Sequence, residues 1–422
     1  MINYNRLSWL LKREILNFSK KICKGLKRPG FKLLSNMLYG ISESGSCHLS
    51  KISRALKEDI TLKKTIERLS RGLDSFSESK KMMDNYLEVV RPFVNEKAIF
   101  VIDGSDVTKP SSKALEGLTE VRDGSTGEIK KGYCTLEIAA LTTTHKAPIS
   151  IYDRVYSTIE EGFLSDDDEV LKGFGYLTQQ FGNKGIRALD RGYDAMIYYE
   201  YFFKKNEKFI IRTKKNRSVI YKGKTLNIME VAQLFKGKYR MDFTDKNGKR
   251  LECKISLIPV SLPKYPSRFL HLVVVYGFGK EPMLLMTNLK SDDPRLATAI
   301  TKVYLMRWRI EEHFRFKKQQ YDFEDFRVRS LNSIRTLHRI LTMLSGLISM
   351  LSEKRTQSLF VMELIEVSKR IYKPKKAKER TKFMSYAIAD GIFAVLNKTL
   401  VGIKSLIAHP PRAFPLQLSL FP

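Results

Sequence analysis

Between Ala98 and Thr213, short apolar runs alternate with longer amphipathic runs, and this alternation limits the possible folds. Strand-like runs occur in the order AIFVID, YCTLEIAALT, PISIYDRVYS, GIRALD and KFIIRT. Two helix-like runs, DDEVLKGFGYLTQQF and DAMIYYEYFFKKN, separate the last three of them. Three strands, a helix, a strand, a helix and a strand predict an α/β layer with mixed strand pairing.

The regions on either side of this layer have other patterns. Residues 1–92 have the apolar spacing of helices, whereas residues 214–290 contain strand-like runs separated by Gly, Asn-Gly and Pro turns. A long helix is expected from Asp293, a good N-cap followed by Pro294, to about Arg329. Helices are expected again beyond it, before a proline-rich tail at 409–422.

The charge of the chain indicates a polyanionic partner. It has 75 Lys and Arg against 45 Asp and Glu, a net charge of +30, and the excess is spread along the chain. Such an excess costs self-repulsion in the folded state, so nucleic acid is the first candidate partner. The longest strongly apolar run, Ile340–Leu351, is too short for a membrane span of ~20 residues. We therefore expect a cytoplasmic, nucleoid-associated protein that binds no membrane.

Several classes of site find no support in the sequence. The four cysteines are far apart, so neither a disulfide framework nor a zinc site is indicated, and we expect them to be reduced and mostly buried. The six histidines are scattered, and no G-x-S-x-G elbow of a serine hydrolase occurs. No G-x-x-x-x-G-K-[ST] loop occurs either, which agrees with a reaction that uses no nucleotide.

Two aspartates stand at the ends of apolar strand-like runs. Asp103 ends AIFVID and Asp190 ends GIRALD. Ligands and metals bind at the edge of a sheet where its central strands end, although an acid there can also form a turn or cap a helix. Asp106 and Asp194 follow closely, and their positions past the apolar runs favour supporting roles.

A third group of residues lies on the predicted long helix. Tyr304, Arg307, Glu311 and Lys318 fall at offsets 0, 3, 7 and 14. At ~100° per residue they occupy an arc of roughly 60°, along the border of the apolar stripe. Taken alone, this pattern also fits an ordinary surface ion pair between Arg307 and Glu311.

The spacing Y-x2-R-x3-E-x6-K in YLMRWRIEEHFRFKK resembles the Tyr-Arg-Glu-Lys motif of one group of DDE transposases from bacterial insertion sequences. VIDGSDVTKP and ALDRGYDA resemble the segments around that family's two aspartates. The resemblance covers roughly residues 95–330. It implies a ribonuclease-H-like core, with the aspartates on its first and fourth strands, and a β-rich insertion before the glutamate helix.

The resemblance also implies a chemistry. Asp103, Asp190 and Glu311 would be the catalytic and metal-binding residues, holding two Mg²⁺ ions (or Mn²⁺) with Asp103 bridging both. Water would first cleave a phosphodiester at the end of the element. The freed 3′-OH would then attack the target strand, and no nucleotide would be needed. The partners implied are double-stranded DNA, as terminal inverted repeats and target, and a second copy of the chain on paired DNA ends.

Other residues are candidate DNA contacts. In the family that the chain resembles, Tyr304, Arg307 and Lys318 correspond to residues that contact the terminal DNA. Trp308 is either a base-stacking residue or a packed core aromatic. Lys109 and Arg212 are candidate backbone contacts. In the N-terminal region, the helices predicted around 49–56 and 62–73 form either a DNA-reading helix-turn-helix or an ordinary helical hairpin.

Five segments are therefore expected, in the following order: a helical DNA-binding region at 1–92, the first part of the core at 93–213, the β-rich insertion at 214–290, the helix with the catalytic Glu at 291–330, and a helical C-terminal region at 331–422. Two alternative functions remain open. One is a nuclease of the same fold without strand transfer, and the other is a non-catalytic DNA-binding regulator. The terminal repeat, the target preference and the excision route are not encoded in any recognisable pattern.

Overall fold

The computed structural model describes residues 2–244, 250–290, 293, 295–398 and 402–403. Its central feature is a mixed sheet in which β4, β3, β1, β5 and β6 are neighbours in that order. The bounds of these core strands are β1 (Ile99–Thr108), β3 (Ile129–Leu141), β4 (Pro148–Tyr156), β5 (Ile186–Leu189) and β6 (Lys208–Arg212). β1 pairs antiparallel with β3 and parallel with β5, and β5 pairs parallel with β6. The predicted ribonuclease-H-like α/β core is confirmed.

The β-rich insertion extends this sheet rather than forming a separate one. Its last strand pairs antiparallel with β6, so the sheet continues through the insertion to β7 and β8. The elements of the insertion are β7 (Ser218–Tyr221), β8 (Lys224–Asn227), α8 (Ile228–Gln233), β9 (Tyr239–Thr244), β10 (Arg250–Leu262), β11 (Tyr265–Tyr276) and β12 (Met283–Thr287). A further short strand, β2 (Thr119–Arg122), pairs with β3 at the opposite edge.

Helices α6 (Asp166–Phe181) and α7 (Met196–Lys205) connect the core strands as predicted. The predicted helix from Asp293 to Arg329 is wrong in its continuity. It is divided into α9 (Leu296–Met306) and α10 (Arg309–Gln320), with a turn at Arg307 and Trp308. The Asp293 carboxylate accepts a hydrogen bond from the backbone N–H of Arg295 at 2.8 Å, and Pro294 lies outside the described residues.

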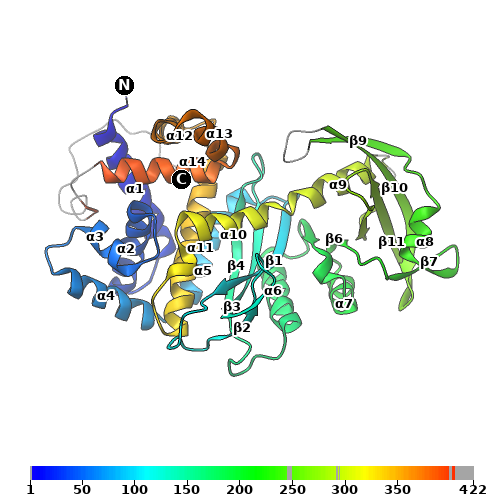
Figure 1. Ribbon diagram of the computed structural model, residues 1–422, viewed down its shortest axis with the longest axis horizontal. Helices are drawn as coiled ribbons and strands as arrows, with labels where there is room; N and C mark the ends of the chain where they lie inside the picture. Colours follow the sequence, from blue (N-terminus) through cyan, green and yellow to red (C-terminus); the bar gives the residue numbers. More distant parts are fainter. Residues whose placement is uncertain (1, 245–249, 291–292, 294, 399–401, 404–422) are drawn as a thin grey trace.

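The break separates two packing contacts. Ala297, Ile300 and Tyr304 of α9 pack on the sheet of the insertion. Ile310 and Phe314 of α10 pack on the core strands. Each helix therefore covers its own part of the extended sheet (Figure 1).

The N-terminal and C-terminal helices form one helical region at the end of the molecule opposite the insertion (Figure 1). The N-terminal helices are α1 (Tyr4–Ile22), α2 (Arg28–Ser44), α3 (Leu49–Leu56), α4 (Leu62–Asp74) and α5 (Ser79–Val90). The C-terminal helices are α11 (Leu331–Glu353), α12 (Leu359–Ile371), α13 (Pro374–Lys382) and α14 (Met384–Asn397). The predicted proline-rich tail at 409–422 lies outside the described residues.

Helix α11 contains the apolar run Ile340–Leu351 and is the central helix of this region. It contacts β4 of the core as well as α2, α4, α5 and α14.

Within the described residues, no helix combines the length and hydropathy that a membrane span needs. All four cysteines are free thiols; Cys134 is half-buried and the other three are buried, as predicted.

Candidate active site

Asp103 and Asp190 lie level with each other on neighbouring strands. β1 and β5 run parallel, and Val101 lies opposite Ala188. Asp103 and Asp190 each follow two residues later, so they lie at the same level. The prediction that Asp103 ends its strand is wrong, because β1 continues to Thr108 along β3. β5 ends at Leu189, however, so Asp103 lies just beyond the part of β1 that is paired with β5. Both carboxylates are thus at the same edge of the core.

Helix α10 places Glu311 above this edge. Side chains alternate along a strand, so Ile99, Val101 and Asp103 share one face of β1. Ile310 and Phe314 pack against Ile99 and Val101 on that face. Burying an apolar side chain of this size contributes about 1.5–3 kcal/mol, which holds the helix against the sheet. Glu311, next to Ile310, is directed toward the exposed border, and its side chain is 38% exposed.

The Arg307 guanidinium joins two of the three carboxylates. Its Nη1 lies 2.9 Å from Asp103 Oδ2, and its Nη2 lies 2.6 Å from Glu311 Oε1. The side chain of Arg307 is only 12% exposed. The alternative interpretation of Arg307 and Glu311 as an ordinary surface pair therefore does not describe this geometry, because the same arginine also reaches a carboxylate on β1.

The electrostatics at this edge favour an added cation. Burial, together with the charges of Asp190 and Glu311, raises the pKa of Asp103 to about 7 against the lowering effect of Arg307. Asp190 accepts a hydrogen bond from the backbone N–H of Gly192 at 2.7 Å. Arg307 thus neutralises only two of the three carboxylates, and the repulsion that remains is the kind that a divalent cation relieves.

The two neighbouring aspartates have other partners. Asp194 is buried and accepts hydrogen bonds from the Tyr199 hydroxyl at 2.8 Å and the Lys214 backbone N–H at 2.7 Å, and it pairs with Arg217. These contacts connect the end of β5 to the start of the insertion. Asp106 accepts from the backbone N–H of Gly124 at 3.1 Å. Both aspartates therefore have structural partners where they stand.

The predicted DNA contacts differ in their surroundings. Lys318 lies 3.0 Å from Glu324 and 3.6 Å from Asp106, at the same border as Glu311. Tyr304 is buried against the insertion sheet, and its pKa is raised by burial. Arg212, at the end of β6, is exposed and near enough to Tyr304 to affect its pKa.

Two residues have surroundings that the sequence did not suggest. Trp308 is 46% exposed, so its interpretation as a packed core aromatic is wrong. Lys109 is buried, and its ammonium donates a hydrogen bond to the Phe326 carbonyl at 2.6 Å. It also lies 3.8 Å from the centre of the Phe326 ring, and burial lowers its pKa to about 8. A phosphate could reach Lys109 only if these contacts were lost.

A buried polar network beneath the site was missed at the sequence level. Glu137 stands opposite Asp103 on β3 and is 1% exposed. Lys317 donates to Glu137, and the Nε2 atoms of His313 and His338 lie 3.3 and 3.2 Å from its carboxylate. Its members come from a strand and two helices that are far apart in the sequence, so no local spacing could reveal it.

Tyr193 is another residue that the sequence analysis did not single out. It is buried, and burial together with the charges of Asp103 and Asp190 raises its pKa well above the usual value. It therefore lies close enough to both aspartates for their charges to affect its pKa. Its position in ALDRGYDA, three residues after the second aspartate, was the only available signal.

Oxygen donors without a cysteine or histidine among them match the preference of Mg²⁺ and Mn²⁺. Among the described residues, however, no three His, Cys, Asp or Glu side chains stand close enough together to hold a metal ion. Arg307 lies between two of the three candidate ligands. The donor chemistry thus fits a divalent ion, and its binding requires Arg307 to give up at least one of its carboxylate partners.

Comparisons with known proteins give one family-model match over part of the chain. No curated protein matches the chain. A solved structure that does match is the cryo-EM structure of a piggyBac transposase synaptic complex with hairpin DNA. The match has 10% sequence identity and a TM-score of 0.42, covering 99% of this chain and 87% of that chain, and this similarity is too low to support an inference. Residues 171–347, which include Asp190 and the whole Tyr304–Lys318 motif, match the family model of the transposase DDE domain.

Proposed function

We propose that this chain is a DNA transposase of the insertion-sequence type, which cleaves DNA strands at the ends of an element and joins them to target DNA. The proposal rests on the placement of Asp103 and Asp190 at one edge of the core, with Glu311 joined to Asp103 through the Arg307 guanidinium. The match of residues 171–347 to the transposase DDE domain supports it independently.

Within this proposal, Asp103, Asp190 and Glu311 would hold two divalent ions, Mg²⁺ or Mn²⁺. When bound, such ions activate the attacking oxygen and stabilise the leaving 3′ oxygen. The chain itself supplies the ligands on two strand edges and one helix, fixed by the packing of Ile310 and Phe314. Arg307 would be free to contact a DNA phosphate once it had lost Asp103 or Glu311 as a partner.

The remaining roles follow from position and charge. Lys318 and the exposed Arg212 lie beside the site and would contact the DNA backbone, with Tyr304 supporting Arg307. We leave Lys109 out of the contact set because its ammonium is already bound to Phe326. We propose residues 1–92 as the region that reads the DNA ends, which a second copy of the chain would pair.

The first prediction concerns Glu311→Gln. Losing one negative oxygen from the metal site should abolish strand cleavage, whereas binding to the element ends should change little. Cleavage and joining would be followed with labelled DNA containing the flanking inverted repeats, a target plasmid and Mg²⁺, and binding by fluorescence anisotropy. Glu324→Gln, an acid near Lys318 but outside the proposed set, is the matched control and should still cleave.

The products also distinguish the alternatives. Joined element–target molecules are expected only from a transposase, whereas cleavage without joining would indicate a nuclease of the same fold. If Glu311→Gln cleaved like the unmodified chain, the proposed catalytic set would be wrong. If neither protein cleaved and both bound the ends equally, the non-catalytic regulator would be the better interpretation.

A further inference from the structure

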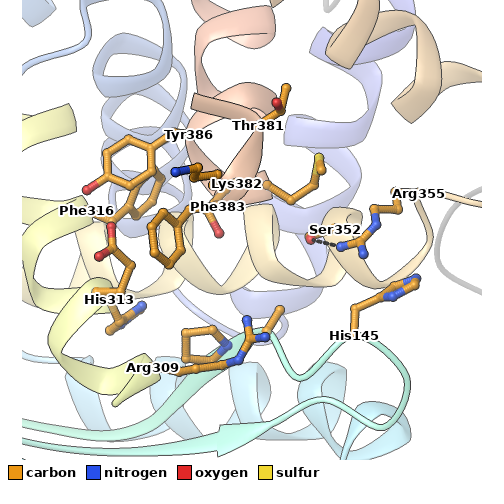
Figure 2. Close-up of a pocket in the computed structure, with 15 residues that line it drawn as sticks. His145, Arg309, His313, Phe316, Ser352, Arg355, Thr381, Lys382, Phe383 and Tyr386 are labelled. Carbon is orange, nitrogen blue, oxygen red and sulfur yellow. Dashed lines mark hydrogen bonds between the residues drawn. The ribbon is translucent and has the colours of Figure 1, made fainter. Parts of the chain in front are cut away.

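A cavity of about 180 Å³ lies on the flank of α10 that faces away from the carboxylates. Arg309, Glu312, His313 and Phe316 line it at helical spacings of three and four residues. At ~100° per residue, this face lies roughly opposite Glu311 and Lys318. The β3–β4 turn, the end of α11 and the junction of α13 and α14 complete the walls (Figure 2). The cavity is therefore separate from the proposed active site.

Basic side chains gather around this cavity without acidic partners of their own. Arg309 has no hydrogen bond or ion pair within the described part of the chain, and burial and the neighbouring Arg355 lower its pKa. Arg355 makes one long side-chain hydrogen bond, to the Ser352 hydroxyl at 3.5 Å. Lys382 stands at the mouth and is exposed. Two guanidinium groups held near each other repel, and an anion between them would relieve the repulsion.

His145 provides an independent sign of a missing ligand. It lines the cavity beside Arg355 (Figure 2), and its Nε2 atom is buried without a hydrogen-bond partner among the described residues. A buried polar atom in this state costs about 1–3 kcal/mol. The turn that carries it is fixed, because Glu353 accepts hydrogen bonds from the backbone N–H groups of Thr144 and His145.

The acids near the cavity are already paired. The Glu312 carboxylate accepts a hydrogen bond from Arg315 at 2.8 Å. Glu353 is saturated by the turn, since it also accepts from the hydroxyls of Thr142 and Thr143. Arg309, Arg355 and Lys382 thus outweigh the one lining acid, Glu312, and the cavity has a net positive charge.

We propose that this cavity binds a phosphate group. Two guanidinium forks and an imidazole match the oxygens of a tetrahedral anion, and the volume of about 180 Å³ leaves room for one together with a few waters. The same chemistry could come from inorganic phosphate or from a DNA phosphodiester.

The surroundings favour DNA as the source of the phosphate, and this part of the inference rests on the proposed function. A second hollow of about 380 Å³ shares Arg309, Glu312, Lys382 and Phe383 with the cavity and is also lined by Trp308. The indole is 46% exposed. An exposed aromatic ring beside cationic groups is the arrangement that binds an unpaired base next to its phosphate.

The test uses the full chain and two ligands. Binding of inorganic phosphate would be measured by isothermal titration calorimetry for the unmodified protein, Arg309→Gln, Arg355→Gln and the double variant. Each single substitution should weaken phosphate binding about 10-fold or more, and the double variant should bind none. Lys224→Gln, which removes one exposed charge from β8 far from the cavity, is the matched control and should bind as the unmodified chain does.

The second ligand identifies the source. A duplex with a single-stranded overhang would be titrated at several salt concentrations, and Arg309→Gln should reduce the slope of log K against log salt by about one if DNA is the ligand. A loss of phosphate binding with an unchanged DNA slope would assign the cavity to a free phosphate. If the double variant, shown by its melting curve to be folded, kept both phosphate affinity and DNA slope, the inference would be overturned.

Failure of this inference is distinguishable from failure of the proposed function. Glu311→Gln lies outside the cavity, so it should lose cleavage and keep phosphate binding. A chain that never cleaves DNA but loses phosphate binding on Arg309→Gln would retain the cavity site and lose only the transposase proposal. Equal losses in Lys224→Gln and Arg309→Gln would show that general charge, not the cavity, binds the anion, and would also overturn the inference.

Discussion

Arg307 has two competing roles in the structure. It neutralises Asp103 and Glu311 at 2.9 and 2.6 Å, and it is nearly buried while doing so. The proposed metal ions need the same carboxylate oxygens. The guanidinium therefore stabilises these carboxylates, and a divalent ion binding there would have to displace it from at least one of them.

This competition leads to a prediction for Arg307→Gln. Mg²⁺ should raise the melting temperature of the unmodified chain, because it binds the folded carboxylates and not the unfolded chain. In Arg307→Gln the rise should begin at a lower Mg²⁺ concentration, since no internal cation has to be displaced. Scanning calorimetry over a Mg²⁺ series measures both. Asp103→Asn should show no rise, and an unchanged Mg²⁺ response in Arg307→Gln would contradict the competition.

Glu353 allows a prediction of pH dependence away from the metal site. Burial alone would raise its pKa, but hydrogen bonds from Thr142 and from the Thr144 and His145 backbone outweigh burial and lower the pKa to about 2. A carboxyl group whose pKa is lowered by folding stabilises the folded chain at pH values above its unfolded pKa, near 4.5. This stabilisation is lost as the pH falls toward 2. Glu353→Gln should therefore cost about 1–2 kcal/mol at pH 7, and the difference should shrink below pH 4.5.

Urea unfolding at a series of pH values would measure this difference. Glu366→Gln is a suitable control, because Glu366 is a half-exposed partner of Lys369 and should contribute little at any pH. A difference between Glu353→Gln and the unmodified chain that stayed constant down to pH 3 would show that the carboxylate charge is not the source of the stability.

At the scale of elements, α10 is held by two different kinds of contact. Ile310 and Phe314 attach it to β1 and β5 through apolar packing. Lys317 attaches it to Glu137 on β3, within a network that continues through His338 to Asp153 on β4. Burial lowers the pKa of His338 to about 4, so its imidazole is neutral near pH 7. The buried Lys317–Glu137 pair thus fixes the rotation of the helix that carries Glu311.

A double-mutant cycle tests the Lys317–Glu137 pair. Lys317→Met leaves the buried Glu137 carboxylate without the hydrogen bond from Lys317 and should destabilise the chain by about 3–5 kcal/mol. The double variant Glu137→Gln with Lys317→Met should be destabilised by less than the sum of the two single variants. Chemical unfolding gives these free energies. The adjacent Lys318→Met, which removes only a partly exposed ion pair, should cost less than ~1 kcal/mol; additive effects in the cycle would rule out the coupling.

The elements also show what the sequence could and could not predict. Apolar periodicity located the core strands, both connecting helices and the strand-rich insertion, because each pattern is local. The break between α9 and α10 has no local signal, since residues 296–320 contain neither Pro nor Gly. Two helices form there because their apolar residues pack on different parts of the sheet. A contact made only in the folded state decides this feature.

Contacts made only in the folded state also decide the features of the candidate site that the sequence did not predict. The apolar runs and the Tyr304–Lys318 spacing pointed to Asp103, Asp190 and Glu311. The fold sets the two aspartates level with each other and links Glu311 to Asp103 through Arg307. Strand β1 continues past Asp103 because β3 pairs with it as far as Thr108, and no property of AIFVID encodes that pairing. The burial of Lys109 depends on Phe326, which is distant in the sequence. The exposure of Trp308 depends on the irregular turn between α9 and α10.

At the scale of the whole molecule, the helical region and the insertion lie at opposite ends, with the candidate site between them (Figure 1). The net charge of +30 is spread over all of these parts. A duplex that reached the site could therefore meet positive charge on either side of it. Binding by many distributed cations releases counterions and depends steeply on salt.

The salt dependence of DNA binding gives the last prediction. Affinity for a duplex should fall linearly on a log–log plot, with a slope of about −0.9 for each phosphate contacted. Arg307→Gln and Lys318→Gln should each reduce the magnitude of the slope by about one, because each removes one proposed phosphate contact. Lys109→Met should leave the slope unchanged, since its ammonium is bound to the Phe326 carbonyl. Fluorescence anisotropy at four salt concentrations, on variants whose melting curves show them folded, measures all three. A reduced slope for Lys109→Met together with an unchanged slope for Lys318→Gln would mean that DNA approaches the chain from another face.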